Sequence, residues 1–196
     1  MKTLIVATSN PGKLREIQAY LMGLPWDLQL KPAEIEVEET GQTFLENACL
    51  KASEVARTTQ EWAIADDSGL EVNALDGAPG LYSARYGRTD AERITRLLRE
   101  LGDDAADRSA RFACAVAIAS PNGHIAASTE AYCPGEILRA PAGSGGFGYD
   151  PIFWVPEVGQ TYAQMSPDTK HQLSHRGRAF AALQSSLQQL AIAPQS

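Results

Sequence analysis

The sequence has few of the features that mark secreted, zinc-binding or membrane-spanning proteins. Its three cysteines, Cys49, Cys114 and Cys133, are odd in number and widely separated. That spacing argues against a disulfide framework or a zinc site and favours buried free thiols. The longest strongly apolar run, 112–119, is far below the ~18 residues of a spanning helix, and the first residues lead directly into a short strand. We therefore expect a soluble, cytoplasmic protein with no membrane partner.

Basic residues are also in deficit. The chain has 17 Lys plus Arg against 24 Asp plus Glu, a formal net charge of −7, which is the wrong sign for binding a nucleic-acid polymer by general attraction. No segment repeats at a fixed period. With 196 residues and 44% hydrophobic content, residues 1–196 are expected to form a single domain, built as two lobes.

The spacing of apolar residues predicts alternating strands and helices. A strand at 3–8 leads into a helix that starts near Pro11, and a capping box begins another helix at Thr43. A buried strand at 62–65 is expected to end in a turn at 66–69. Further predicted elements are a helix at 89–101, a hairpin of 111–119 with 125–133, a glycine-rich loop at 141–151 and a terminal helix from Ser174. This order favours an α/β fold with a mixed, partly antiparallel sheet.

The first candidate for chemistry is the strand-to-helix junction at 8–13, Thr-Ser-Asn-Pro-Gly-Lys. Small residues let a ligand approach the backbone, free helical N–H groups attract an anion, and Lys13 adds a positive charge. The usual phosphate loop is ruled out, because residue 7 is alanine and Leu14 follows the lysine. Taken alone, the segment is better explained as a turn and a helix cap.

The second candidate is the acidic pair Asp66 and Asp67. Adjacent strand residues point to opposite faces of a sheet, so only one carboxylate can enter a ligand crevice there. Glu38 or Glu39 could complete an oxygen-only Mg²⁺ site with it. The alternatives at this point are an ordinary Asp-Ser-Gly turn and a solvated glutamate-rich face.

Two further segments combine polar and aromatic residues. The loop at 143–151 interleaves glycines with an aromatic pair, an aspartate and a proline. This mixture is less typical of a flexible linker than of a shaped loop, whose aromatic ring could stack on a base. The segment 174–177, Ser-His-Arg-Gly with Lys170 one turn before it, offers donors near a helix start. The alternatives are a core phenylalanine in a connecting loop and a helix cap with two exposed cations.

Together these segments resemble the non-canonical purine nucleoside triphosphate pyrophosphatases. The resemblance spans nearly the whole chain and is carried by seven stretches in order. They are Thr8-Ser9-Asn10-Pro11-Gly12-Lys13, Glu38-Glu39-Thr40-Gly41, Phe44-Leu45-Glu46-Asn47-Ala48 with Lys51, Ala65-Asp66-Asp67-Ser68-Gly69-Leu70, Gly77-Ala78-Pro79-Gly80 with Ser83-Ala84-Arg85-Tyr86, Gly145-Gly146-Phe147-Gly148-Tyr149-Asp150-Pro151, and Ser174-His175-Arg176-Gly177.

The resemblance implies a two-lobed mixed α/β fold with an elongated sheet, an active cleft between the lobes and a homodimer. It also implies Mg²⁺-dependent hydrolysis of ITP, dITP and XTP to the monophosphate and pyrophosphate. By the same resemblance Glu39 and Asp67 hold the metal, and Asp67 is the candidate base; matching does not decide between Glu38 and Glu39. The implied triphosphate contacts are Thr8, Ser9, Asn10, Pro11, Gly12, Lys13 and Lys51. The implied nucleoside contacts are Ser68, Phe147, Gly148, Tyr149, Asp150, Lys170, His175 and Arg176.

The residues support this chemistry on separate grounds. A triphosphate brings several negative charges to an acidic protein, so a metal ion, Lys13, Lys51 and a helix N-terminus are needed to offset them. No Ser-His-Asp or Cys-His arrangement is suggested, which argues against a covalent route. Two alternatives stay open: a non-catalytic nucleotide sensor, and a related pyrophosphatase that acts on canonical or pyrimidine triphosphates.

Overall fold

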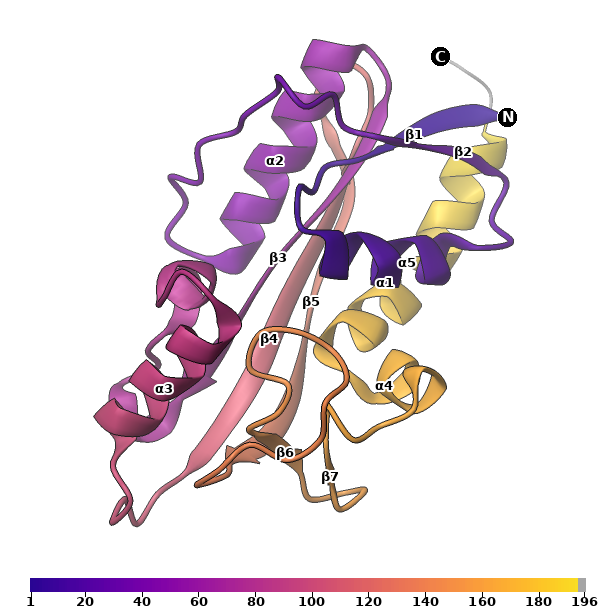
Figure 1. The fold of residues 1–196 in the computed structure, drawn as a ribbon. Coiled ribbons are helices and arrows are strands. Elements are labelled where there is room, and N and C mark those ends of the chain that lie inside the picture. Colours follow the sequence, from indigo (N-terminus) through magenta and orange to yellow (C-terminus); the bar gives the residue numbers. More distant parts are fainter. Residues whose placement is uncertain (194–196) are drawn as a thin grey trace. The chain divides into compact units, whose positions relative to one another are not determined.

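The computed structural model describes residues 1–193, in which helices alternate with the strands of a sheet (Figure 1). The strands are β1 (Lys2–Val6), β2 (Trp26–Leu30), β3 (Trp62–Val72), β4 (Ser109–Ala119), β5 (Ile125–Ile137), β6 (Phe153–Val155) and β7 (Gln160–Thr161). The helices are α1 (Pro11–Leu21), α2 (Phe44–Thr59), α3 (Asp90–Leu101), α4 (Pro167–Leu173) and α5 (His175–Ile192), with short 3₁₀ helices at Asn73–Leu75 and Gly80–Arg85. Within these residues no helix is both long and apolar enough to cross a membrane.

The seven strands form one sheet in the order β2-β1-β3-β4-β5-β6-β7. Strand β1 pairs in parallel with β2 and β3, with α1 and α2 as the connecting helices. Strand β6 pairs antiparallel with β5 and β7. The sequence-based prediction of an α/β fold with a mixed, partly antiparallel sheet is therefore confirmed.

The contacts of the chain divide it into two compact units. Unit 1 comprises residues 1–67, 114–131 and the chain from 176 onward, and unit 2 comprises 68–113 and 132–175. Each unit has its own hydrophobic cluster.

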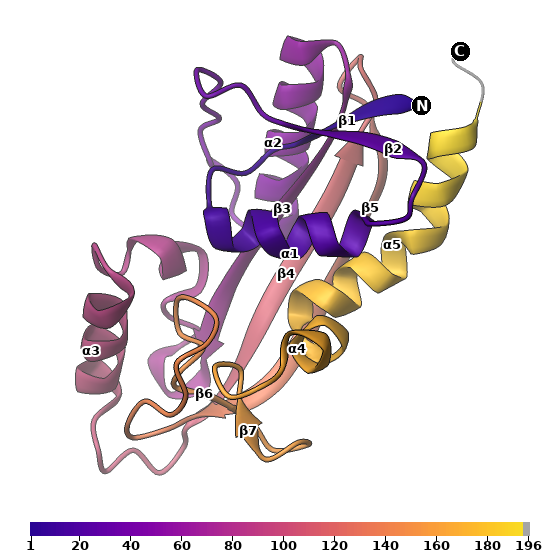
Figure 2. The same ribbon diagram turned by 45° about the vertical axis from the view of Figure 1, so that its right-hand side comes forward.

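In unit 1 the sheet is covered on both faces by helices. Figures 1 and 2 show α2 on the opposite side of the strands from α1 and α5. The α1 and α5 side carries large side chains, and its cluster includes Leu4, Val6, Ile17, Leu21, Ile64, Val116, Ile118, Phe180, Leu183 and Leu187. Small buried residues alternate with these along the strands, among them Ala63, Ala65, Ala115 and Ala117. Helix α2 likewise buries mostly small residues, Ala48, Ala52 and Ala56 with Val55, so alternation along the strands gives each helix layer a matching face.

Unit 2 is organised around aromatic and branched side chains. Its cluster contains Leu70, Val72, Tyr86, Ile94, Leu97, Leu101, Phe112, Cys133, Ile137, Tyr149, Ile152, Phe153, Val155, Tyr162 and Met165. Phe112 contacts three other rings at centroid distances of 4.6 to 5.5 Å. The glycine-rich loop and α4 belong to this unit.

The turn expected at 66–69 is not formed. Strand β3 instead continues without a break for 11 residues, from Trp62 to Val72. Aspartate and glycine are poor strand formers, but tertiary contacts override that preference here: Asp66 and Asp67 each bind cations, and the Leu70 N–H donates to Ser83 Oγ at 2.9 Å. The short helix α4 was also not anticipated. It is capped by Ser166, begins at Pro167 and ends immediately before Ser174, after which α5 begins.

Candidate active site

The junction between β1 and α1 is shaped by Asn10. Its side chain caps the helix by accepting hydrogen bonds from the N–H groups of Gly12 (2.8 Å) and Lys13 (3.2 Å), and its own N–H donates to Thr8 Oγ1. Pro11 occupies the first helical position, as predicted. The expectation of free amides at this helix start is wrong for Gly12 and Lys13, because the cap already uses both. Lys13 is the cation that this junction presents.

Asp66 and Asp67 face opposite sides of the unit 1 sheet, as strand alternation predicted. Asp66 lies on the side of α1 and α5, where Lys13 Nζ is 3.1 Å from its Oδ2 and Arg176 Nη2 is 3.0 Å from the same oxygen. Asp67 lies on the side of α2 and contacts Lys51 and Asn47. The two neighbouring carboxylates therefore have different side chains in direct contact.

The cluster around Asp66 is buried. The side chains of Asp66 and Arg176 are 0% and 2% exposed, and Arg176 also donates to Glu16 on α1. Burial alone would raise the pKa of Asp66, but Lys13, Arg176 and Lys51 outweigh it and hold that pKa well below its usual range. Arg176 is therefore not an exposed cation, as the helix-cap alternative assumed. Its guanidinium is oriented by two carboxylates within unit 1.

This burial gives a prediction about stability. Replacing Asp66 with asparagine leaves Arg176 and Lys13 without their shared buried anion, and removing one partner of a buried ion pair costs about 3–5 kcal/mol. Urea denaturation followed by circular dichroism should show a loss of this size in the free energy of unfolding. The matched variant Glu16→Gln acts on a partly exposed partner of the same arginine and should cost clearly less. An Asp66→Asn protein as stable as the wild type would contradict this account of the cluster.

On the other face of β3, Asp67 is held by α2. Lys51 Nζ donates to Asp67 Oδ1 at 3.0 Å and to Glu39 Oε1 at 2.8 Å. Asn47 Nδ2 donates to Asp67 Oδ2 at 3.3 Å. Asn47 and Lys51 are four residues apart, so they project from the same face of the helix. Both predicted metal ligands, Glu39 and Asp67, thus meet at Lys51, whereas Glu38 is exposed.

Burial alone would lower the pKa of Lys51. The carboxylates of Asp67, Asp66 and Glu39 outweigh it and raise that pKa above its usual value. Lys51 therefore stays protonated and places a positive charge between the two predicted metal ligands.

Asn47 is a site residue that the sequence analysis missed. It is buried, and its Oδ1 accepts the Gly41 N–H at 2.8 Å while its amide nitrogen reaches Asp67. A side chain at position 41 would collide with Asn47, because a Cβ there would lie 2.7 Å from Asn47 Oδ1. Asn47 thereby ties the segment that follows Glu39 to Asp67. The signal in the sequence was its four-residue spacing from Lys51 on a helix that begins with a capping box.

In unit 2 the glycine-rich loop folds around Asp150. The Asp150 carboxylate accepts the Phe147 N–H at 2.8 Å and receives Lys170 Nζ at 2.6 Å. Gly146 has a φ of +72°, and a Cβ there would lie 1.9 Å from Asp150 Oδ2. Only glycine fits that position. Lys170 also lies 4.8 Å from the centroid of the Phe147 ring, so three of the predicted nucleoside contacts converge.

The remaining residues of unit 2 that were predicted to contact the nucleoside are hydrogen-bonded to other parts of the unit or buried in its core. Tyr149 is buried and its hydroxyl donates to the Ser83 carbonyl at 2.9 Å, while the Gly148 N–H donates to Asp90 Oδ2 at 2.7 Å. These bonds fix the loop to the segments that precede and begin α3. His175 is also buried and stacks on Phe112 at 4.6 Å, so it too is not an exposed cation. Ser68 is half-buried on β3.

The cysteines offer no nucleophile. Cys114 and Cys133 are buried, as predicted, whereas Cys49 is half-buried. Burial raises the pKa of the Cys114 thiol to about 12, so it stays protonated at neutral pH. Burial and the nearby Glu130 raise the pKa of Cys49 as well.

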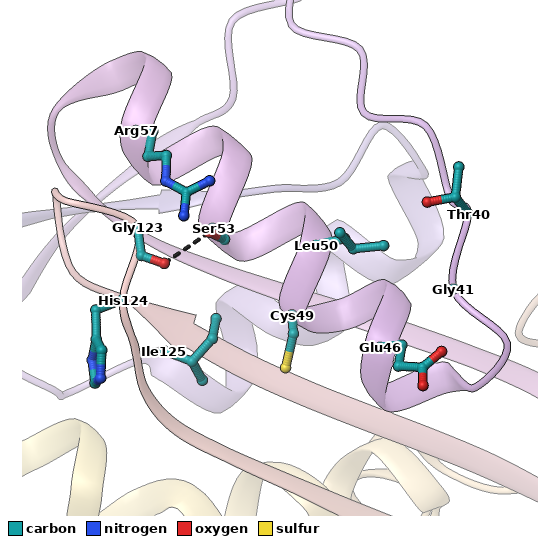
Figure 3. Close-up of a pocket in the computed structure, with 10 residues that line it drawn as sticks. All are labelled: Thr40, Gly41, Glu46, Cys49, Leu50, Ser53, Arg57, Gly123, His124 and Ile125. Carbon is teal, nitrogen blue, oxygen red and sulfur yellow. Dashed lines mark hydrogen bonds between the residues drawn. The ribbon is translucent and has the colours of Figure 1, made fainter.

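A groove lies alongside α2 in unit 1. Figure 3 shows its lining, which combines one face of α2 with the β4–β5 turn; Ser53 Oγ donates to the Gly123 carbonyl at 2.7 Å across it. The lining residues are Thr40, Gly41, Glu46, Cys49, Leu50, Ser53, Arg57, Gly123, His124 and Ile125. None of the predicted catalytic, metal-binding or substrate-binding residues is among them. The groove is therefore lined by residues other than those predicted from the sequence to bind substrate or metal.

Comparison with known families places this chain in a defined class. The profile of the Ham1 family matches residues 4–186, and the chain belongs to that family. It is 68% identical over 182 residues to a dITP/XTP pyrophosphatase from Nostoc sp., covering 93% of this chain and 92% of that protein. It is 62% identical to a dITP/XTP pyrophosphatase from Synechocystis sp., covering 93% and 94%. Among solved structures, a HAM1 protein from Coxiella burnetii matches with a TM-score of 0.85 at 42% identity, covering 95% of this chain and 98% of the other.

Proposed function

We propose that the protein is a hydrolase that cleaves non-canonical purine nucleoside triphosphates, dITP, XTP and ITP, to the monophosphate and pyrophosphate. Its relatives from Nostoc and Synechocystis carry the name dITP/XTP pyrophosphatase. The observation that carries the proposal is the meeting of Glu39 and Asp67 at Lys51 on one face of the sheet. This arrangement supplies paired carboxylates and a cation for cleavage of a phosphoanhydride.

We assign the metal to Glu39 and Asp67, with Mg²⁺ as the ion. Mg²⁺ is typically held through one or two carboxylates together with substrate phosphates and water. Within residues 1–193 no group of three or more His, Cys, Asp or Glu side chains is arranged to hold a metal, so a dedicated protein cage is not the site. Two carboxylates already gathered around one positive charge fit this mode of binding. When bound, Mg²⁺ would neutralise phosphate charge and favour departure of pyrophosphate.

The residues of unit 1 then have distinct tasks. Lys13, Lys51 and the junction at 8–12 bind the triphosphate, and Asp66 holds Lys13 in place. Asp67 accepts a proton from the attacking water, whose oxygen forms a bond to the α-phosphorus. The bond from that phosphorus to the bridging oxygen breaks, and pyrophosphate leaves. Asn47 fixes the Asp67 carboxylate for this proton transfer.

We assign nucleoside recognition to Phe147 and its neighbours. The Phe147 ring offers a stacking surface, and Asp150 and Lys170 fix the loop that carries it. Ser68, Gly148, Tyr149, His175 and Arg176 complete the proposed nucleoside contacts. We further propose that the protein works as a homodimer, on the strength of the resemblance described above.

Product analysis tests the proposed function. With Mg²⁺ and a panel of ITP, dITP, XTP, GTP and ATP, we expect pyrophosphate and the monophosphate from the first three, with much slower release from GTP and ATP. Pyrophosphate and orthophosphate are assayed separately. Orthophosphate with a nucleoside diphosphate would place the protein in a different reaction class, and binding of ITP without any product would make it a nucleotide sensor.

A further inference from the structure

The ammonium group of Lys51 lies where a metal ion would be expected to bind. It is 2.8 Å from Glu39 Oε1 and 3.0 Å from Asp67 Oδ1. The second Asp67 oxygen, Oδ2, accepts from Asn47. Lys51 is mostly buried, with its side chain 13% exposed. The two proposed metal ligands are therefore already occupied by a cation that belongs to the chain.

A carboxylate oxygen that binds an ammonium group closely is less available to a metal ion. Mg²⁺ also loses its own water reluctantly, so it competes poorly with a lysine that is already in place. Lysine differs from a metal ion in having a flexible four-carbon stem. The ammonium group can therefore turn from the carboxylates to a nearby phosphate group and stay within the site. An arriving triphosphate would offer Lys51 a new anion and release the two carboxylates.

We propose that Lys51 occupies the metal site until the nucleotide arrives, so that nucleotide binding and metal binding strengthen each other. This inference rests on the function and metal ligands proposed above. The coupling is reciprocal. A nucleotide that draws Lys51 away raises the affinity for the metal, and the metal raises the affinity for the nucleotide by the same factor. Metal alone binds weakly to the protein, and the metal and the triphosphate bind as a pair.

The test uses Mn²⁺ as the metal probe and α,β-methylene-ITP as a nucleotide probe that cannot be cleaved between those phosphates. Electron paramagnetic resonance measures Mn²⁺ affinity without nucleotide, and calorimetry in EDTA measures the affinity of the metal-free analogue. The variants are Lys51→Met, Lys51→Arg and Lys13→Met. Lys13 is a matched control, because its side chain is similarly buried, 16% exposed, but pairs with Asp66 on the other face of β3.

Lys51→Met should bind Mn²⁺ alone about tenfold more tightly or better and bind the metal-free analogue about tenfold more weakly. Lys51→Arg keeps a cation between the carboxylates and should bind Mn²⁺ nearly as weakly as the wild type. Lys13→Met should weaken binding of the analogue but change the Mn²⁺ affinity by no more than about twofold. These opposite effects at Lys51 would not arise from a general loss of folding, which circular dichroism checks directly.

Two results would overturn the inference. One is Mn²⁺ affinity in Lys51→Met that is equal to or below that of the wild type. The other is an equal gain in Lys13→Met, which would reflect total charge and not occupancy of the site. Failure of the proposed function is a separate observation, since it would appear as the absence of pyrophosphate from wild-type protein and ITP whatever the Mn²⁺ affinities are.

Discussion

Replacing Asp67 with asparagine should lower turnover of ITP by about 10²–10⁴ while leaving the fold intact, which is the usual scale for loss of a general base. Asparagine has almost the same shape as aspartate, but its one side-chain oxygen can accept from only one of Lys51 and Asn47. It cannot accept the proton of the attacking water. It also weakens the proposed metal site. Steady-state pyrophosphate release measures the effect, and circular dichroism verifies the fold.

Asp66 provides the comparison for this experiment, since it is the adjacent residue on the same strand. It faces α1 and α5, where it contacts Lys13 and Arg176. Its replacement should destabilise the protein more than replacement of Asp67 but cost less turnover per folded molecule. Assays are therefore run at low temperature, with the folded fraction determined for each variant. Equal losses of turnover in the two variants, or a fully active Asp67→Asn protein, would show that the catalytic assignment is wrong.

Replacing Arg176 with alanine should lower activity on ITP and also narrow the ratio of ITP to ATP activity. Hypoxanthine and xanthine present a 6-oxo acceptor where adenine presents a 6-amino donor. A guanidinium held in a fixed orientation by Asp66 and Glu16 would face the adenine amino group donor to donor. Sites that hydrogen-bond one substrate group can discriminate by about 10⁴–10⁵, because the wrong ligand leaves buried polar groups unpaired.

The control for base selectivity is Phe147→Ala. The ring can stack on any purine, so its loss should raise KM for ITP and ATP alike and leave their ratio nearly unchanged. The kcat/KM values for both substrates, measured in each variant, separate the two roles. If Arg176→Ala lowers both activities by one common factor, Arg176 binds phosphate or holds the structure together, and it does not select the base.

Local sequence signals predicted much of the fold. Thr43 and Thr89 each cap a helix by accepting the N–H of the glutamate three residues on, Glu46 and Glu92. The hairpin around Gly123 also forms as expected, with the Gly123 N–H donating to the Ser120 carbonyl at 2.7 Å. These features depend on residues within one turn of each other, which a sequence displays directly.

Ion pairs between residues far apart in the sequence could not be predicted from these local signals. The continuity of β3 depends on partners for Asp66 and Asp67 that come from other elements. Arg176 is buried because Asp66 and Glu16, 110 and 160 residues away in sequence, neutralise it. Strand alternation did predict that the two aspartates diverge, but it gave no indication of which cations each would meet. Propensity alone therefore suggested a turn where the folded protein has a strand.

The position of water attack tests the central claim most directly. Hydrolysis of ITP in H₂¹⁸O with Mg²⁺, followed by mass spectrometry of the products, locates the oxygen that enters. Attack on the α-phosphorus predicts ¹⁸O in the inosine monophosphate and unlabelled pyrophosphate. Label in the pyrophosphate would mean attack on the β-phosphorus, and labelled orthophosphate would mean loss of the terminal phosphate; either result would contradict the mechanism built on Asp67.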